Sequence, residues 1–166
     1  MSLPATLDHT GIASRIPHHG RMCLLDAVQS WDGDHITCQA SSHRATDNPL
    51  RANDRLGAAC GIEYAAQAMA VHGALVGESL GGDSGAPKAG YLASIRSVAL
   101  QVDRLDTVVG DLILKAERMT GDTATVLYSF TVEADGQVLL SGRAVVVLDA
   151  AGLVAAPAAV PVPGNA

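Results

Sequence analysis

One long run of small and apolar residues, Leu56–Gly77, constrains the fold more than any other feature of the chain. The run is dominated by Ala and Gly, and Glu63 is the only formally charged residue between Arg55 and Glu78. This composition is typical of a helix that is buried along most of its length. A carboxylate on such a helix must be desolvated, paired or used, and a desolvated carboxyl suits proton transfer near neutral pH. Glu63 is therefore the first candidate for a functional residue.

The overall composition predicts one domain whose core is filled by aliphatic side chains. The chain has 166 residues, of which 48% are hydrophobic and only 3% aromatic, so Ala, Val and Leu must fill the core. Leu56–Gly77 is long enough to span a membrane, which takes about 20 apolar residues. Its Ala and Gly content, together with Glu63, Gln67 and His72, argues instead for a helix inside a protein.

Charge and cysteine content limit the classes of partner and compartment. A net charge of −6 at pH 7 argues against nucleic-acid binding, which usually needs a basic surface. Met1–Gly20 lacks the basic and apolar regions of a secretory signal. The cysteines Cys23, Cys38 and Cys60 lack metal-ligand spacing and are odd in number, which indicates reduced thiols in a cytoplasmic protein. The six histidines also lack such spacing, so we expect no bound metal.

Alternating hydrophobicity predicts six strands around the helix. Two precede it and are joined by an Asp-Gly turn; these are Met22–Ser30 and His35–Ser42. Four follow it, and we expect them to form a meander; these are Gly90–Asp103, Val108–Met119, Thr123–Glu133 and Val138–Asp149. We expect residues 1–149 to form the single domain, and residues 150–166, rich in Ala, Pro and Val, to form a mobile tail.

Two strands, one long helix and then four strands indicate an α+β protein rather than an alternating α/β protein. A long apolar helix beside one antiparallel sheet suggests that the sheet curls around the helix. This pattern matches the hot-dog fold, in which an antiparallel sheet wraps a central helix. Hot-dog domains usually cover their remaining helix face and sheet edge by dimerising, so we expect a homodimer.

Glu63 and Gln67 are four residues apart and therefore share one face of the predicted helix. Small residues continue this face and leave a groove in which a linear acyl chain could lie. Gly57 and Ala58 stand at the helix start, where unpaired backbone N–H groups can bind a thioester carbonyl oxygen. A plainer alternative is that Glu63 is paired with an arginine in the core.

Two segments resemble 3-hydroxyacyl-acyl-carrier-protein dehydratases. The stretch Gly61–Ala70, with the sequence Gly-Ile-Glu-Tyr-Ala-Ala-Gln-Ala-Met-Ala, is similar to the Glu-Ala-Met-Ala-Gln helix of these enzymes. The stretch Ile16–Asp26, with the sequence Ile-Pro-His-His-Gly-Arg-Met-Cys-Leu-Leu-Asp, is similar to their Pro-His-Arg…Leu-Leu-Asp strand. The chain resembles most the aryl-polyene type of this family, over about Ile16 to Asp149.

The resemblance implies elimination of water from 3-hydroxyacyl thioesters on acyl carrier protein, giving trans-2-enoyl thioesters in fatty-acid, aryl-polyene or polyketide-like biosynthesis. In the family a histidine before the helix removes the α-proton, and the helix carboxylate, here Glu63, protonates the departing hydroxyl. A backbone N–H at the helix start, here Gly57 or Ala58, polarises the thioester, and no cofactor is needed. The histidine position falls at Asn48, whose amide cannot act as a general base near neutral pH.

Three explanations for Asn48 remain open at the sequence level. His43, five residues earlier in the same loop, could supply the base. Glu63 could perform both proton transfers, alone or through a water ordered by Asn48. Alternatively, the protein binds acyl carrier protein without dehydrating, as a partner of an active dehydratase. A hot-dog thioesterase is a further alternative, because a helix carboxylate can activate water without a histidine.

Other histidines are expected to have structural roles, whereas the arginines are candidates for a docking surface. His18 and His19 stand at a strand entrance and are expected to be structural, and His72 is expected to be a hydrogen-bonded core or interface group. Because acyl carrier proteins are acidic, the resemblance implies a basic patch beside the substrate entrance. The candidates for that patch are Arg15, Arg21, Arg51, Arg55, Lys88 and Arg96. A heteromer with another hot-dog protein, or a higher oligomer, is also compatible with the sequence.

Overall fold

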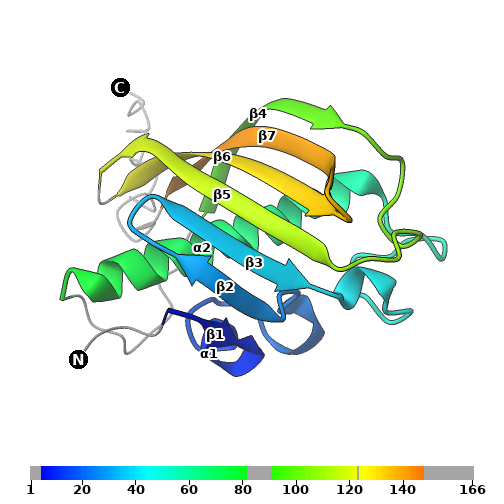
Figure 1. Ribbon diagram of the computed structural model, residues 1–166, viewed down its shortest axis with the longest axis horizontal. Coiled ribbons are helices and arrows are strands. Elements are labelled where there is room, and N and C mark those ends of the chain that lie inside the picture. The colour runs from blue at the N-terminus through cyan, green and yellow to red at the C-terminus, as the bar shows by residue number, and fades with distance from the viewer. Residues whose placement is uncertain (1–4, 82–90, 123, 148–166) are drawn as a thin grey trace, which may run out of the picture.

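A seven-stranded antiparallel sheet curls around one long helix, α2, in the computed structural model (Figure 1), which describes residues 5–81, 91–122 and 124–147. The elements in chain order are β1 (Leu7–Asp8), α1 (His9–Ala13), β2 (Ala27–Trp31), β3 (His35–Ala40), α2 (Gly61–Ser79), β4 (Tyr91–Leu100), β5 (Leu112–Gly121), β6 (Thr125–Ala134) and β7 (Gln137–Val147). Short 3-10 turns occur at Gly20–Met22, Ser42–Arg44 and Ala58–Cys60. The predicted α+β hot-dog architecture is confirmed.

The order of strands differs from the predicted meander at one position. The sheet runs β1-β2-β3-β5-β6-β7-β4, so β5, β6 and β7 form a meander but β4 lies at the far edge. β4 cannot stand beside β5, because β5 pairs with β3 on one side and with β6 on the other. β4 pairs instead with β7, with Ile95 opposite Ala144 and Leu100 opposite Leu140.

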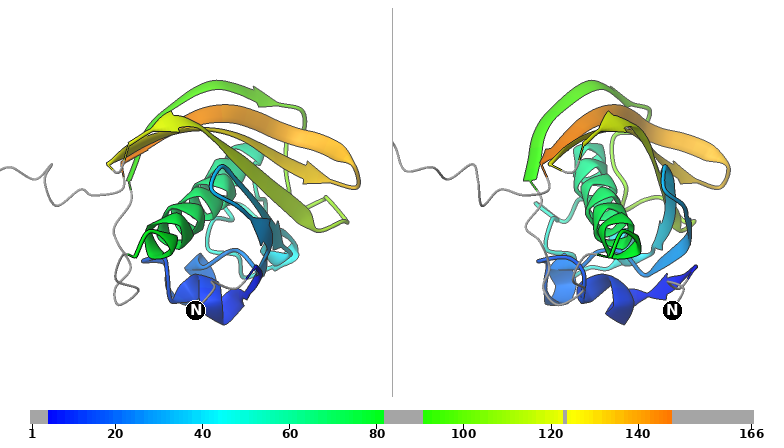
Figure 2. Two further views of the ribbon diagram at one scale, coloured as in Figure 1. Left: turned by 60° about the vertical axis from the view of Figure 1, so that its left-hand side comes forward. Right: turned by 90° about the vertical axis from the view of Figure 1, so that its left-hand side faces the viewer.

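The helix fits closely under the sheet because small residues line its buried side. Ala65 and Ala68 are fully buried, and Gly61 lies so close to β7 that an added Cβ would be 2.6 Å from a methyl of Leu140. The sheet arches over α2 in both views of Figure 2. The predicted helix, Leu56–Gly77, is confirmed for most of its length, although its first turn is a 3-10 turn and its α-helical part begins at Gly61.

A buried histidine fixes α2 against the sheet. His72 is fully buried, with Nδ1 at 2.8 Å from the Tyr128 hydroxyl on β6 and Nε2 at 2.8 Å from the Asp32 carbonyl oxygen. Asp32 belongs to the turn between β2 and β3, where its carboxylate accepts the N–H groups of Asp34 and His35. His72 therefore joins the helix to two separate parts of the sheet, as a core group of the kind predicted.

The edge strand β4 is the least covered part of the sheet. Its apolar side chains Tyr91, Leu92, Val98 and Leu100 are between 38% and 56% exposed in the single chain. α2 packs chiefly against β3, β5 and β6, and no helix of the described residues packs closely on β4. In the described part of the chain, no helix is long and apolar enough to cross a membrane. The predicted tail, residues 150–166, lies outside the described residues.

Candidate functional site

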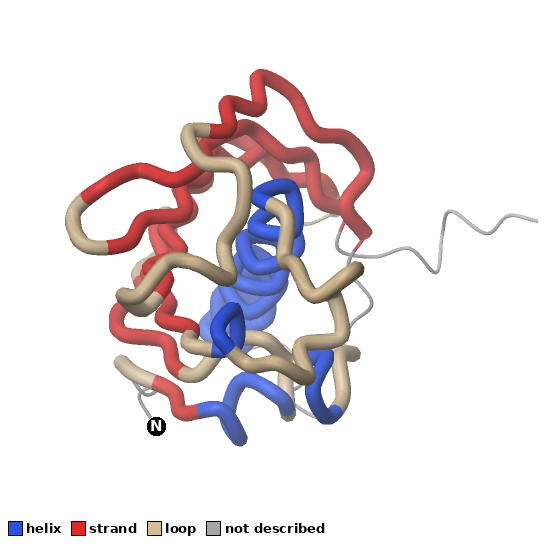
Figure 3. The backbone as a smooth tube through the Cα atoms, turned by 90° about the vertical axis from the view of Figure 1, so that its right-hand side faces the viewer, coloured by secondary structure: helices blue, strands red, loops and turns tan. Residues whose placement is uncertain are grey.

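His18 and Glu63 meet at the N-terminal end of α2. The Nε2 atom of His18 lies 3.0 Å from Oε1 of Glu63, and the two side chains are 27% and 34% exposed. Glu63 is in the first turn of the helix, whereas His18 belongs to the loop before the 3-10 turn Gly20–Met22. Figure 3 looks onto this end of the helix, where the long loops of the chain gather. The two residues form an imidazole–carboxylate pair within one chain.

Gln67 connects the segment that follows His18 to the helix. Its Oε1 accepts the Leu24 N–H at 2.9 Å, and its Nε2 donates to the Met22 carbonyl at 2.8 Å. The same Nε2 donates to Oε1 of Glu63 at 3.1 Å, so Glu63 and Gln67 share a face as predicted. Gln67 is fully buried, and both of its N–H donors are used within the chain.

Glu63 is less buried than the apolar helix implies. Its side chain faces the loops at the end of the helix rather than the sheet, which leaves it about one-third exposed in the single chain. Its partner is a histidine and an amide rather than the arginine that the plainer alternative required. Oε1 of Glu63 therefore accepts an N–H of Gln67 and lies within hydrogen-bonding distance of Nε2 of His18, while no hydrogen bond to Oε2 is found among the described residues.

Asn48 lies in a separate hydrogen-bond network and does not meet Glu63. Its Nδ2 donates to the Ser42 carbonyl at 2.8 Å and to the Tyr64 hydroxyl at 3.0 Å. Its Oδ1 accepts the Leu50 N–H at 2.8 Å, so the side chain ties its own loop to the helix. Because Tyr64 follows Glu63 directly, it points about 100° away around the helix. Within one chain Asn48 therefore does not contact Glu63, and the role expected for Asn48 in the site stays a prediction.

His43 does not contact Glu63 in the described chain either. It is fully buried, and its Nε2 lies 3.1 Å from the Val108 carbonyl oxygen, while Nδ1 has no partner in the described structure. Burial lowers the pKa of His43, an effect that its hydrogen bond to Val108 partly opposes. A neutral histidine buried in this way cannot swing out as a base without opening the loop. The position of His43 therefore does not favour the first explanation for Asn48, in which His43 supplies the base.

The predicted amide donors Gly57 and Ala58 differ in availability. The Ala58 N–H already donates to the Asp103 carbonyl at 3.0 Å. Gly57 pairs with Arg104 in an isolated bridge, its own N–H donates to the Cys60 thiol, and the space beside its Cα is open. Because a thiol is a weak acceptor, the Gly57 N–H is the one of the two that a ligand at the start of the helix can take over more readily.

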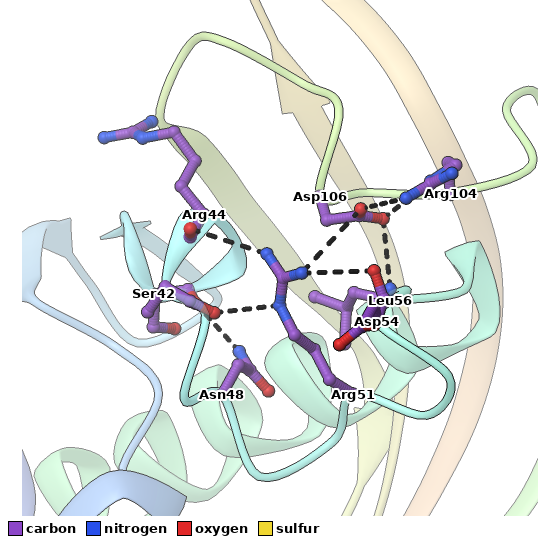
Figure 4. A network of polar contacts seen from close by, with 9 residues as sticks. Ser42, Arg44, Asn48, Arg51, Asp54, Leu56, Arg104 and Asp106 are labelled. Carbon is purple, nitrogen blue, oxygen red and sulfur yellow. Dashed lines mark hydrogen bonds and ion pairs between the residues drawn. The ribbon is translucent and has the colours of Figure 1, made fainter.

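A cluster of charged residues holds the loop that carries Gly57 (Figure 4). Asp106 accepts the Leu56 N–H at 3.0 Å and is paired with Arg104, and Arg51 lies 4.0 Å from its other oxygen. The Arg104 guanidinium and the Leu56 N–H hold the pKa of Asp106 far below its usual value. Arg51 also donates to the carbonyls of Ala45 and Asp54, which closes the loop around Asp106.

A shallow cavity of about 260 Å³ opens beside the pair but does not include it. One wall is formed by residues 20–24 and the other by the loop of Ser42 and Asn48. Cys23, in the first wall, lies 3.9 Å from Nδ1 of His9, and burial raises the pKa of its thiol. The described residues contain no group of three or more His, Cys, Asp or Glu side chains placed to hold a metal ion.

The sequence reasoning missed His18 as a site residue. The available signal was the Ile16-Pro-His-His stretch, which forms part of the dehydratase-like pattern but was interpreted as structural. Of the two histidines, His18 reaches Glu63, while His19 is exposed and begins the 3-10 turn. Periodicity cannot identify which loop residue reaches a helix 45 positions away, since that depends on tertiary contacts such as those of Gln67.

Solved structures that match this fold include both dehydratases and thioesterases. The dehydratase heterocomplex ApeI:P from Xenorhabdus doucetiae matches with a TM-score of 0.73 and 23% identity, covering 86% of this chain and 91% of that chain. A mutant thioesterase from Pseudomonas aeruginosa matches with a TM-score of 0.52 and 11% identity, over 74% and 79% of the two chains. A hypothetical thioesterase with coenzyme A from Streptococcus pneumoniae gives 0.52 and 10%, over 73% and 83%. At these identities the likeness shows the fold.

The family is shown by sequence rather than by these structures. No curated protein sequence gives a significant match to the chain. The model of the ApeP-like family, described as ApeP dehydratase, matches residues 10–153, a range that contains His18, Glu63 and Gln67. The chain therefore belongs to the ApeP-like family of dehydratases.

Proposed function

We propose that the protein eliminates water from 3-hydroxyacyl thioesters carried by acyl carrier protein, and that His18 and Glu63 are its catalytic pair. The observation that carries this proposal is the 3.0 Å contact between Nε2 of His18 and Oε1 of Glu63 in a chain of the ApeP-like dehydratase family. Elimination beside a thioester requires a base for the α-proton, an acid for the hydroxyl and a donor for the carbonyl oxygen. Imidazole and carboxyl groups are suited to the first two tasks.

The pair accounts for the protons of the reaction if it holds one shared proton. In the reactive form, His18 is neutral and the Glu63 carboxyl is protonated. His18 removes the α-proton, the C–O bond at the β-carbon breaks, and Glu63 gives its proton to the departing hydroxyl, which leaves as water. The pair then holds an imidazolium and a carboxylate, and one transfer across the Nε2–Oε1 contact restores the reactive form. No proton has to enter from solvent during a turnover.

Gly57 is the proposed donor to the thioester oxygen. Its N–H is held only by the Cys60 thiol, a weak acceptor, and stands at the start of the helical segment that leads to Glu63. The negative charge that develops on the oxygen as the α-proton leaves would be stabilised by this N–H and by the N-terminal end of the helix. The Asp106 cluster supports the assignment, because it fixes Leu56 and thereby the direction of the next amide.

One assay separates this function from its alternatives. Wild-type protein and the Glu63→Gln variant are incubated with a 3-hydroxyacyl thioester on acyl carrier protein, and enoyl absorbance and free thiol are followed together. Dehydration predicts enoyl product without thiol, and loss of activity in Glu63→Gln. Full activity of Glu63→Gln would contradict the proposal.

The thioesterase alternative rests on the fold shared with the two thioesterases and on the one-third exposure of Glu63, which leaves it open to water. It predicts free thiol that depends on Glu63 and no enoyl product. A third result, neither product but stable association with a carrier protein or an active dehydratase, would indicate the non-catalytic role.

The proposed partners are an acyl carrier protein and a second hot-dog chain. The exposed apolar side chains of strand β4 support the second hot-dog chain, and one matching structure is itself a dehydratase heterocomplex.

The carrier needs a cation that is not already paired. Three of the candidate arginines, Arg15, Arg21 and Arg51, are each paired with an acidic residue. Arg55 is exposed, has no side-chain partner in the described chain and lies two residues from Gly57. It is the cation that we assign to carrier docking, while Lys88 lies outside the described residues.

A further inference from the structure

The loop between β4 and β5 holds both backbone groups of Leu56. The Leu56 N–H donates to the Asp106 carboxylate at 3.0 Å, and the Leu56 carbonyl oxygen accepts the Leu105 N–H at 2.8 Å. The carbonyl and the N–H of a trans peptide lie in one plane and point in opposite directions. The bond from Leu105 therefore also fixes the direction of the next amide, the Gly57 N–H.

The amides on either side of Gly57 both point to the same loop. The Leu56 N–H goes to Asp106, and the Ala58 N–H donates to the Asp103 carbonyl at 3.0 Å. Successive N–H groups of an extended segment point to opposite sides, so the Gly57 N–H is directed away from the loop. On that side it meets the Cys60 thiol, which a better acceptor can displace.

We propose that Asp106 is a positioning residue that acts through the Gly57 N–H. This inference rests on the proposed function, since it assumes that the N–H stabilises the charge on the thioester oxygen. The Asp106 side chain is 6% exposed and bonds to Leu56 on the loop side of the segment. It therefore sets the direction of the amide and does not contact the substrate.

Arg104 keeps the charge of Asp106 from opposing the reaction. An uncompensated carboxylate near the thioester oxygen would raise the energy of the negative charge that develops there. Arg104 pairs with both oxygens of Asp106, with Nε at 2.9 Å from Oδ1, and Arg51 lies 4.0 Å from Oδ2. Two guanidinium groups thus outweigh the single carboxylate behind the amide.

The test is a double-mutant cycle of Asp106→Ala and Gly57→Pro in the full-length chain, with a 3-hydroxyacyl thioester as substrate. Gly57 has a φ of −63°, which proline also adopts, and the space beside its Cα is open. Gly57→Pro therefore removes the N–H without strain at this residue. Asp106→Ala is expected to lower kcat about 10- to 100-fold with KM nearly unchanged, since a displacement of about 1 Å can cost about that much. In Gly57→Pro the same substitution should change kcat less than about twofold, because the amide that it positions is gone.

Asp111 provides the matched control. It stands at the end of the same loop and also pairs with an arginine, Arg44, at 2.7 Å, but no bond from it to residues 56–58 is found in the described chain. Asp111→Ala is expected to keep kcat within a few-fold of wild type. Hydrogen exchange at the Leu56 amide should accelerate in Asp106→Ala and stay slow in Asp111→Ala, because only the first variant removes its acceptor.

If Asp106→Ala proves too unstable, Asp106→Asn enters the same cycle. It keeps one acceptor oxygen but loses the charge, so a smaller fall in kcat that again disappears in Gly57→Pro is expected. Unchanged kcat in both Asp106 variants, or an equal loss with and without the Gly57 N–H, would overturn the inference. Full activity in Glu63→Gln would instead overturn the proposed function, so the two failures are distinguishable.

Discussion

Nε2 of His18 and Oε1 of Glu63 are 3.0 Å apart although 45 positions separate the two residues in the chain. Neither residue comes from an element that was expected to meet the other, since one lies in an N-terminal loop and the other in the central helix. Both belong to the same chain, so the proposed acid and base do not require a second subunit to be brought together.

Substitution of His18 should affect activity much more than substitution of its neighbour His19. His18→Asn removes the imidazole that contacts Glu63 and is expected to lower kcat by about 10²- to 10⁴-fold, the usual contribution of general acid–base catalysis. His19→Asn is the matched control, because His19 is exposed and does not contact the carboxylate. Steady-state kinetics on a 3-hydroxyacyl thioester measure both. Equal activities of the two variants would rule out His18 as the base.

Most of the fold could be predicted from the sequence because hydrophobic patterning is a local property. The helix, the hairpin of β2 and β3 and the meander of β5 to β7 were all predicted by it. The edge position of β4 was not, because the pairing of β4 with β7 joins segments separated by two other strands. Patterning shows which residues are buried, but it carries little information about which strand a given strand will pair with.

Only the helix residues of the candidate site could be predicted from local patterns in the sequence. Glu63 and Gln67 were identified because i and i+4 residues share a helix face. The loop residues were chosen by their position in the sequence, Asn48 at the expected histidine and His43 five residues before it, and in the single chain they are held by Tyr64 and Val108, so their roles in the site stay predictions. His18 is placed by hydrogen bonds from Gln67 to the following backbone, which no local pattern encodes.

Charge reversal at Arg55 should weaken the reaction of a carrier-bound substrate specifically. Arg55→Glu is expected to raise KM severalfold for a 3-hydroxyacyl group on acyl carrier protein, because it replaces an attractive charge by a repulsive one. KM for the same acyl group on a small thiol should stay unchanged. Arg143→Glu, at an exposed position of β7, provides the control for a general charge effect. Equal changes with both thioesters would show that Arg55 does not dock the carrier.

A charge on the inner side of β4 should prevent assembly with a second hot-dog chain. Leu92 is 38% exposed and lies opposite the buried Val146, so Leu92→Glu places a carboxylate where a partner would be packed. The comparably exposed Val138, in the turn region of β7, gives the control variant Val138→Glu. Light scattering after size exclusion is expected to show a smaller species for Leu92→Glu alone. An unchanged mass would exclude β4 as the interface.

Stability should fall as the pH drops below about 6.5 because of His72. Burial lowers the pKa of this histidine from its ordinary value of 6.5. Below pH 6.5 the histidine is therefore protonated in the unfolded chain but stays neutral in the folded chain. Each such proton removes up to about 1.4 kcal/mol per pH unit from the free energy of unfolding. His43 acts in the same direction, whereas the exposed His35, whose pKa is raised by Asp32, acts in the opposite one.

The contribution of His72 is isolated by comparing urea unfolding of wild type and His72→Gln from pH 8 to pH 5. The variant should be less stable at pH 8, where it lacks the bonds to Tyr128 and Asp32, but should lose less stability on acidification. Parallel pH profiles of the two proteins would show that His72 is not the group responsible.

Two glycines of α2 should respond to alanine in opposite directions. At Gly61 an added Cβ would lie 2.6 Å from Cδ2 of Leu140, so Gly61→Ala is expected to cost about 1–3 kcal/mol of stability through overpacking. At Gly77 an added Cβ meets no atom within 4 Å, so Gly77→Ala should add about 0.5–1 kcal/mol through reduced backbone entropy of the unfolded chain. Chemical denaturation of the two variants measures both changes. Shortening the opposing side chain in Gly61→Ala/Leu140→Val should recover part of the loss, and a full loss in the double variant would mean that the helix does not pack on β7 at this point.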